Sequence, residues 1–262
     1  MKVTSNVASV GRRLLGVVVF LGALVIWEIW ARAENSFYVP PLTEVLDRAW
    51  HVWPTNDFLT EASSSVKRLA AGFVIGAGLG IAIGLLMGAS RTTRRVLEPS
   101  IELLRATPPI AIVPAFIVVL GFGDSMRIGV IAFGVCFPVL VNTFEGVRAV
   151  SPEVRDTASM LHVDGAERLL RIYLPAALPS IMAGLRIGIS IGLVLVVVSE
   201  FVGEGGGLGH YILDQQGQFN VPEMYAGILF LGLLGYVLNR VFVLVERRVL
   251  AWHYGAAGDP AH

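Results

Sequence analysis

The sequence predicts an all-α polytopic membrane protein with about six transmembrane helices. Of its 262 residues, 55% are hydrophobic and only 15% are charged, which lies outside the range of ordinary globular domains. Six mostly apolar stretches come close to the length of about 20 residues that a helix needs to cross a hydrocarbon core about 30 Å thick. The basic residues gather mainly in the connections on one side. Together these observations indicate a bundle of helices in a lipid bilayer.

The expected spans lie within a single transmembrane domain, residues 1–262. The first follows a basic N-terminal segment, as a signal peptide does, but Trp27 and Trp30 close it where a cleavage site would stand, so we expect it to be retained. The third and fourth are short and separated by 124–127, which predicts a tight helical hairpin. The six spans are 14–31, 69–89, 106–123, 128–144, 172–200 and 224–245.

The distribution of lysine and arginine predicts the orientation of these spans. Basic clusters precede the first span, follow the second, separate the fourth from the fifth and follow the sixth, whereas residues 187–239 contain no lysine or arginine. We therefore expect both termini in the cytoplasm and the loop between the fifth and sixth spans outside. Lys67 and Arg68 are exceptions, and we expect their long side chains to reach the outer headgroups.

Glycines recur at every fourth position of the second span, on one helix face. Small residues allow helices to approach closely in lipid, where no hydrophobic force holds them together. Packing within the chain is the favoured interpretation, and pairing with a second subunit is the alternative. The glycines are Gly72, Gly76, Gly80, Gly84 and Gly88, and the fifth span repeats the pattern with Gly184, Gly188 and Gly192.

Three prolines, Pro108, Pro109 and Pro114, interrupt the third span near its start. Each removes a backbone donor, and the freed carbonyls are tolerated in a membrane where protein or a water-filled cavity satisfies them. The third span therefore either lines a passage or is simply kinked. The candidate pathway residues are Thr107, Pro108, Pro114, Asn142, Ser199 and Glu200.

The connection between the fourth and fifth spans is too long and too patterned for a simple turn. Ser151, Pro152 and Glu153 form a helix start, with a capping hydroxyl, proline at the first position and an acid in the first turn. We expect a short helix that ends near 162–165 and a second one from Ala166 toward Pro175. A short projecting helix suits a groove on a soluble partner.

The same connection carries the motif Asp156-Thr157-Ala158, then His162, then Ile172-Tyr173-Leu174-Pro175. This motif resembles the cytoplasmic signature of binding-protein-dependent ABC importer permeases, Glu-Ala-Ala followed by Gly and then Ile-x-Leu-Pro. His162 stands where the signature has a glycine, which allows a left-handed turn, and nearby Gly165 offers another place for the bend. Further resemblance, in segments such as 65–73, 104–114, 174–186 and 250–253, is to the nitrate, sulfonate and taurine group of these permeases.

The resemblance implies a type I ABC importer permease in a bacterial inner membrane. Its expected partners are membrane lipid, a second copy of the permease in a homodimer, two ATPase subunits at the cytoplasmic face and an external solute-binding protein. The expected cargo is a small anion similar to a sulfonate, taurine or nitrate. The coupling segment is 151–171, and the residues expected to couple to the ATPase are Asp156, Thr157, Ala158, Met160, Leu161, His162, Val163, Gly165, Leu174 and Pro175.

The residues themselves give no sign of an enzyme. A phosphate-binding loop ends in Gly-Lys-Ser/Thr, but the only lysines are Lys2 and Lys67, and neither follows a glycine. The five histidines are scattered without metal-ligand spacing. We therefore expect no catalytic residue, metal or cofactor in this chain, and ATP with magnesium on the partner ATPase. The net charge of zero gives no reason to expect nucleic acid.

Charged residues within spans are costly, by about 2.5–3.5 kcal/mol at a helix centre, and usually serve function. Glu200 either faces the passage or forms a structural pair. Arg186 either attracts an anionic substrate or extends to the cytoplasmic interface. The two are separated by about 21 Å along a helix and cannot pair with each other. The glycines at 203–209 predict a flexible external loop beside the docked binding protein.

Two other classes of protein remain open at this point. A secondary transporter driven by an ion gradient predicts several intramembrane acids or an inverted repeat, and Glu200 is the one strong candidate acid. A membrane scaffold would explain the glycine pattern, but it would not need the patterned connection at 151–171.

Overall fold

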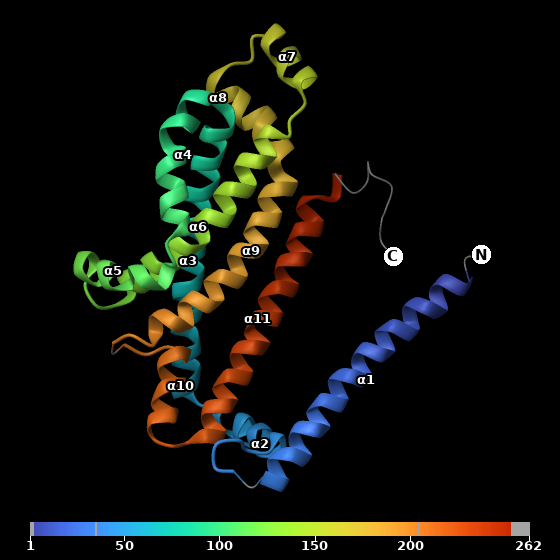
Figure 1. Cartoon of the computed structure of the whole chain (residues 1–262), viewed down its shortest axis with the longest axis vertical. Helices are drawn as coiled ribbons and strands as arrows, with labels where there is room; N and C mark the ends of the chain where they lie inside the picture. The colour runs from blue at the N-terminus through green and yellow to red at the C-terminus, as the bar shows by residue number, and fades with distance from the viewer. Residues whose placement is uncertain (1–2, 35, 204, 253–262) are drawn as a thin grey trace. The chain divides into compact units, whose positions relative to one another are not determined.

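A computed structural model describes residues 3–34, 36–203 and 205–252, with side chains from residue 15 (Figure 1). Lys2, part of the basic N-terminal segment, and His253, part of the segment 250–253 that resembles the permease family, lie outside these residues. The described part is helical, without a strand. Its helices are α1 (Val3–Glu34), α2 (Leu42–Val52), α3 (Asn56–Ala89), α4 (Arg91–Ala106), η1 (Pro109–Ile112), α5 (Val113–Leu120), α6 (Asp124–Arg148), α7 (Pro152–Met160), α8 (Gly165–Arg168), the π-helix η2 (Leu169–Tyr173), α9 (Leu174–Glu200), α10 (Leu208–Gly217) and α11 (Val221–Val249).

Five helical segments of the described chain are long and apolar enough to cross a membrane: Leu15–Glu34, Asn56–Ala89, Asp124–Arg148, Gly165–Glu200 and Val221–Val249. A sixth is counted if α4 and the segment Pro109–Leu120, which are bent by 94° at their junction, form one broken span. The expectation of an all-α fold with about six membrane helices is confirmed.

The region expected to hold the third span contains this break. α4 ends at Ala106, Pro108 is extended, and Pro109 starts the short helix η1 because a first helical position needs no backbone donor. α5 that follows has only eight residues. Residues 106–123 are therefore not one straight helix, and the expected hairpin is instead a short bent segment joined to the 25 residues of α6.

The chain divides into two compact units, Met1–Leu59 with Tyr211–Phe230 and Thr60–His210 with Leu231–His262. Aromatic contacts hold the first unit together. The ring of Phe58 lies edge-on to those of Tyr211 and Phe230, and Trp53 Nε1 donates a hydrogen bond to the carbonyl of Ala226 at 3.2 Å. Many apolar side chains of α1 are more than half exposed, as a lipid-facing helix requires, including Val18 and Ile26.

The second unit is built around α6, whose valines 130, 135 and 139 are fully buried. The glycines of α3 lie against this helix. A Cβ atom placed on Gly80 would be 2.6 Å from the carbonyl oxygen of Cys136, and one on Gly84 would be 2.7 Å from that of Leu140. The glycines of α9 face α6 in the same way, Gly184 toward Pro138 and Gly188 toward Val135. The glycine pattern thus packs helices within the chain, the interpretation that the sequence favours.

Candidate functional site

Helix α7 lies at one end of the second unit, beyond the ends of α6 and α9, and the C-terminal end of α9 lies at the other (Figure 1). It starts as the sequence predicts. The backbone N–H of Val154 donates to Ser151 Oγ at 3.4 Å, and Pro152 occupies the first helical turn. Glu153 accepts from its own backbone N–H and from Ser151, which lowers the pKa of its carboxyl group. The expected short helix is therefore present, with a cap encoded by its own residues.

Two arginines attach α7 to the helices beneath it. Arg155 donates to the carbonyls of Val147 and Arg148, at the end of α6, at 3.0 Å each. Arg168 donates to the carbonyl of Arg155 at 2.5 Å and to Ser159 Oγ at 2.9 Å. Both guanidinium groups lie within about 6 Å of the Tyr173 ring centre, where cations are attracted. The sequence analysis missed these positioning residues, although basic side chains near a helix C-terminus are a recognised signal.

The predicted coupling residues fall into two groups. Ala158 is buried beneath α7, whereas the side chains of Met160 and Leu161 are 79% and 70% exposed. Two large apolar side chains thus project from the end of α7, and the hydrogen bonds of Arg155 and Arg168 hold this helix in place. Asp156 and Thr157 are also exposed on α7, and Val163, which follows the helix, is half-buried. Gly165 is the first residue of α8, and Leu174 and Pro175 are the first residues of α9.

His162 adopts the left-handed conformation of the glycine that it replaces, with φ of 54°. Val163 N–H donates to the carbonyl of Ala158 at 3.0 Å, and His162 N–H to that of Ser159 at 3.1 Å, which is the Schellman pattern that ends many helices. Gly165 makes a second left-handed turn at φ of 58°. The left-handed turn that ends α7 therefore lies at His162, the position of the glycine in the family signature, and the turn at Gly165 is an additional one.

Replacing His162 with glycine is expected to stabilise the protein by about 0.5–1 kcal/mol. A left-handed conformation costs an ordinary residue about 1–2 kcal/mol, and the larger freedom of glycine in the unfolded chain offsets part of the gain. Thermal unfolding of the purified protein in detergent measures the effect. Asp156→Gly, at an exposed right-handed position of α7, is the matched control and should destabilise the protein, by less than about 1 kcal/mol. Equal losses in both variants would contradict a left-handed His162.

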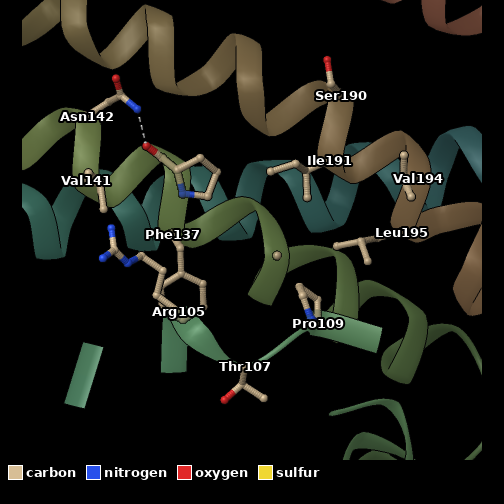
Figure 2. A pocket seen from close by; sticks show the side chains of 12 residues that line it. Arg105, Thr107, Pro109, Phe137, Val141, Asn142, Ser190, Ile191, Val194 and Leu195 are labelled. Carbon is tan, nitrogen blue, oxygen red and sulfur yellow. Dashed lines mark hydrogen bonds between the residues drawn. The ribbon is translucent and has the colours of Figure 1, made fainter. Parts of the chain in front are cut away.

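A cavity of about 700 Å³ opens between the break after α4, α6 and α9 (Figure 2). Its walls are mostly apolar, and Arg105 is the charged residue among those that line it. Asn142 Nδ2 donates to the carbonyl of Pro138 at 2.8 Å. Two predicted pathway residues, Thr107 and Asn142, line this cavity. The full lining is Arg105, Thr107, Pro109, Gly134, Phe137, Pro138, Val141, Asn142, Ser190, Ile191, Val194 and Leu195.

The other predicted pathway residues lie elsewhere. Pro108 immediately precedes η1 and Pro114 lies in the first turn of α5. Ser199 and Glu200 are fully buried at the end of α9. The structure therefore brings two of the six candidates to one cavity and places Glu200 in a different environment.

That environment is a group of polar and charged residues, the Glu200 cluster: Ser65, Arg68, Arg127 and Glu200 are buried, and Asp124 lies at its exposed edge. Arg68 Nη1 donates to Glu200 Oε1 at 2.9 Å, and Arg68 Nε to Asp124 Oδ1 at 2.8 Å. Ser65 Oγ donates to both Glu200 oxygens at 2.8 Å. Arg68 is only 5% exposed, so the expectation that it reaches the headgroups is wrong. The opposite charges of Arg68 and Glu200 compensate each other, which lowers the cost of burying the two residues.

The glycine loop after α9 is bound to this cluster. Arg68 donates to the carbonyls of Gly205 at 2.7 Å and Gly206 at 2.8 Å. Gly207 N–H donates to the carboxylate of Glu61, and Gly209 N–H to Glu200 Oε2 at 2.9 Å. The positive φ angles of Gly205, Gly206 and Gly207 bring the loop backbone onto the charged side chains. The expected flexible loop is thus held by at least four hydrogen bonds in its described part.

Arg186 pairs with a residue that the sequence analysis did not consider. Its guanidinium group forms an ion pair with the carboxylate of Glu246 on α11. The Glu246 side chain is 11% exposed, whereas that of Arg186 is 47% exposed. The arginine charge is therefore balanced by a carboxylate in direct contact, which weakens the case for Arg186 as an attractor of anions.

A protein-family model for binding-protein-dependent transport system inner membrane components matches residues 76–251, a stretch that includes α7, the cavity and most of the Glu200 cluster. The chain belongs to this family. It is therefore a multi-pass membrane protein and a transport permease, as the motif at 156–175 predicts.

Relatives of the permease indicate to which group within the family it is similar. An aliphatic sulfonates transport permease protein described in Bacillus subtilis is 37% identical over 74% of this chain and 70% of its own. The bicarbonate transport system permease of Synechococcus elongatus is 32% identical over 90% and 89%. The nitrate import permease of Leptolyngbya laminosa is 26% identical over 92% and 89%. The resemblance to the nitrate and sulfonate group is confirmed.

Solved structures confirm the architecture of the permease. A chain of the MetNI methionine ABC transporter, in inward-facing conformations, superposes with a TM-score of 0.64 at 16% identity, over 73% of this chain and 95% of its own. A chain of a bacterial alginate ABC transporter, solved with a periplasmic protein, gives 0.59 at 14% identity over 92% and 93%. The fold is that of type I ABC importer permeases.

Proposed function

We propose that this permease forms the membrane pathway of an ATP-driven importer for a small anion. It works as a homodimer with both termini in the cytoplasm, binds two separate ATPase subunits that carry ATP and magnesium, and receives its solute from an external binding protein. The relatives named for aliphatic sulfonates, bicarbonate and nitrate transport support an anionic cargo. We assign the polar residues that line the cavity to the pathway: Arg105, Thr107, Asn142 and Ser190.

The exposed tip of α7 is the observation that carries this proposal. Met160 and Leu161 are large, apolar and more than two-thirds exposed, while Arg155 and Arg168 hold their helix to the end of α6 and to α8. A rigid helix with an apolar tip suits a groove on a soluble partner, and burial of one such side chain contributes about 1.5–3 kcal/mol. We assign α7 as the helix that receives the motion of the ATPase.

Met160→Asp is expected to lower the affinity for the ATPase subunit at least ten-fold, because it removes an apolar contact and buries a charge in the groove. Co-purification of the tagged permease with its ATPase subunit measures the effect, together with ATP-dependent uptake in vesicles. Ala158 is a poorer site for this test, because it is buried and a charged replacement would disturb the attachment of α7 itself.

Two controls accompany this variant. Met160→Leu keeps an apolar side chain of similar size and should retain the ATPase. Ala166→Asp places the same charge at an exposed position of α8, outside α7, and should also retain it. Retention of the ATPase by Met160→Asp, or ion-coupled uptake by the purified permease alone, would overturn the proposal.

A further inference from the structure

Four arginines from three elements surround a second cavity, of about 360 Å³, at the end of the unit that carries α7. We call this group the arginine basin: Arg91 and Arg94 of α4, Arg148 of α6 and Arg155 of α7. The remaining lining residues are apolar or aromatic, and none is acidic: Met87, Gly88, Ala89 and Phe144. A cavity with this lining has a strongly positive interior.

Contacts around the basin hold the arginines without neutralising all of them. Arg94 pairs with Glu98 at 2.9 Å, and Arg148 pairs with Glu145 at 3.4 Å. Both guanidinium groups also lie over the Phe144 ring, at 5.2 and 5.3 Å from its centre. Glu98 and Glu145 each pair with one of the four arginines, which leaves two arginines of the basin without a paired carboxylate among the described residues and an excess of two positive charges. The buried Nε of Arg155 has no hydrogen-bond partner in the described part of the chain.

The position of the basin indicates where its ligand comes from. It lies where α3 ends, α4 begins and α6 ends, and such ends of membrane-spanning helices are found at the level of the lipid headgroups. Basic pockets at this level between helices bind the phosphates of anionic lipids. Guanidinium groups match phosphate oxygens in pairs of hydrogen bonds, so a phosphate satisfies several of these arginines together.

We propose that the arginine basin is a binding site for a phosphate group, supplied by an anionic phospholipid headgroup or by a soluble phosphate. This site is separate from the solute pathway and from the tip of α7, and it does not depend on the proposed transport function. A bound phosphate connects the junction of α3 and α4 to α6 and α7, so it stabilises the base on which α7 stands.

Thermal unfolding of the full-length permease in a neutral, lipid-free detergent tests this site. Three probes are titrated: short-chain phosphatidylglycerol, phosphatidylcholine of the same chain length, and inorganic pyrophosphate. Phosphatidylglycerol is expected to raise the Tm. Arg91→Gln and Arg148→Gln should each shift the titration midpoint about five-fold to higher concentration, the equivalent of about 1 kcal/mol per arginine at a membrane surface.

Arg95→Gln is the matched control, because Arg95 is exposed near the start of α4 but does not line the basin. It removes the same charge from the same helix and should leave the midpoint unchanged. An arginine-dependent effect of phosphatidylglycerol alone assigns the site to lipid, and one of pyrophosphate as well assigns it to phosphate from either source. Equal effects of phosphatidylcholine, equal shifts in Arg91→Gln and Arg95→Gln, or no effect of any probe would overturn the proposal.

Discussion

Glu200→Ala is expected to lower the free energy of unfolding by about 3–5 kcal/mol, because it leaves a buried guanidinium group without its main counter-charge. Glu200 is fully buried and Arg68 is 5% exposed, so water cannot replace the lost carboxylate. Asp124, the other acid bound to Arg68, has a side chain that is 65% exposed and contributes less. Denaturant or thermal unfolding of the purified permease in detergent measures the loss.

A double-mutant cycle separates this interaction from general damage. Arg68→Met combined with Glu200→Leu should be less destabilising than the sum of the two single changes, because no unpaired charge remains buried. The exposed ion pair of Arg171 and Glu167 has the same distance of 2.9 Å and serves as the control. Arg171→Met should cost no more than about 1 kcal/mol, since water screens that pair. Strictly additive losses at Arg68 and Glu200 would show that the two residues do not act as a pair.

Gly80→Leu is expected to prevent α3 from packing on α6 and so to abolish the folded permease. Even the Cβ atom of Gly80→Ala would lie 2.6 Å from the carbonyl oxygen of Cys136 and 2.9 Å from Cβ of Val139. Backbone atoms of a packed helix cannot move aside cheaply, and overpacking of this kind costs about 1–3 kcal/mol for a single methyl group. The leucine adds three further carbons, and loss of a monodisperse peak in size-exclusion chromatography measures its effect.

Gly78 provides the control for this change. It lies on the same helix two residues away, and a Cβ atom placed on it would meet nothing within 4 Å. Gly78→Ala should therefore keep or raise the Tm of the parent protein, while Gly80→Ala lowers it. Similar behaviour of the two alanine variants would contradict the close contact between α3 and α6.

The features predicted correctly are those encoded within a single segment. Glycine at every fourth position marks one helix face, and that face proves to be the one that packs on α6. Ser151, Pro152 and Glu153 predict the start of α7, where the Ser151 cap is observed. Apolar runs predict the membrane helices because their length is set by the bilayer.

The features that were missed depend on contacts between distant residues. Arg68 bonds to Glu200, 132 residues away, and Arg186 pairs with Glu246, 60 residues away. Nothing near Arg68 in the sequence distinguishes a buried arginine from one that reaches the headgroups. The same pairings explain why the loop of glycines is bound rather than free.

Helix α4 was missed for a different reason. Its sequence alternates polar and apolar residues with the helical period, a signal that was present but lay outside the expected spans. An amphipathic helix of 16 residues is not detected by a search for long apolar runs. Two arginines of the basin, Arg91 and Arg94, belong to this helix, so the basin was not predicted either.

The helix that starts at Gly165 continues through η2 and α9 to Glu200, a run of 36 residues. At about 1.5 Å per residue it is about 54 Å long, well beyond the hydrocarbon thickness. One continuous helix therefore connects the base of α7 to Glu200, whose carboxylate binds the glycine loop at the opposite end. A displacement of α7 is therefore expected to reach the glycine loop through this helix, which can bend at the π-helical turn Leu169–Tyr173 and at Pro179.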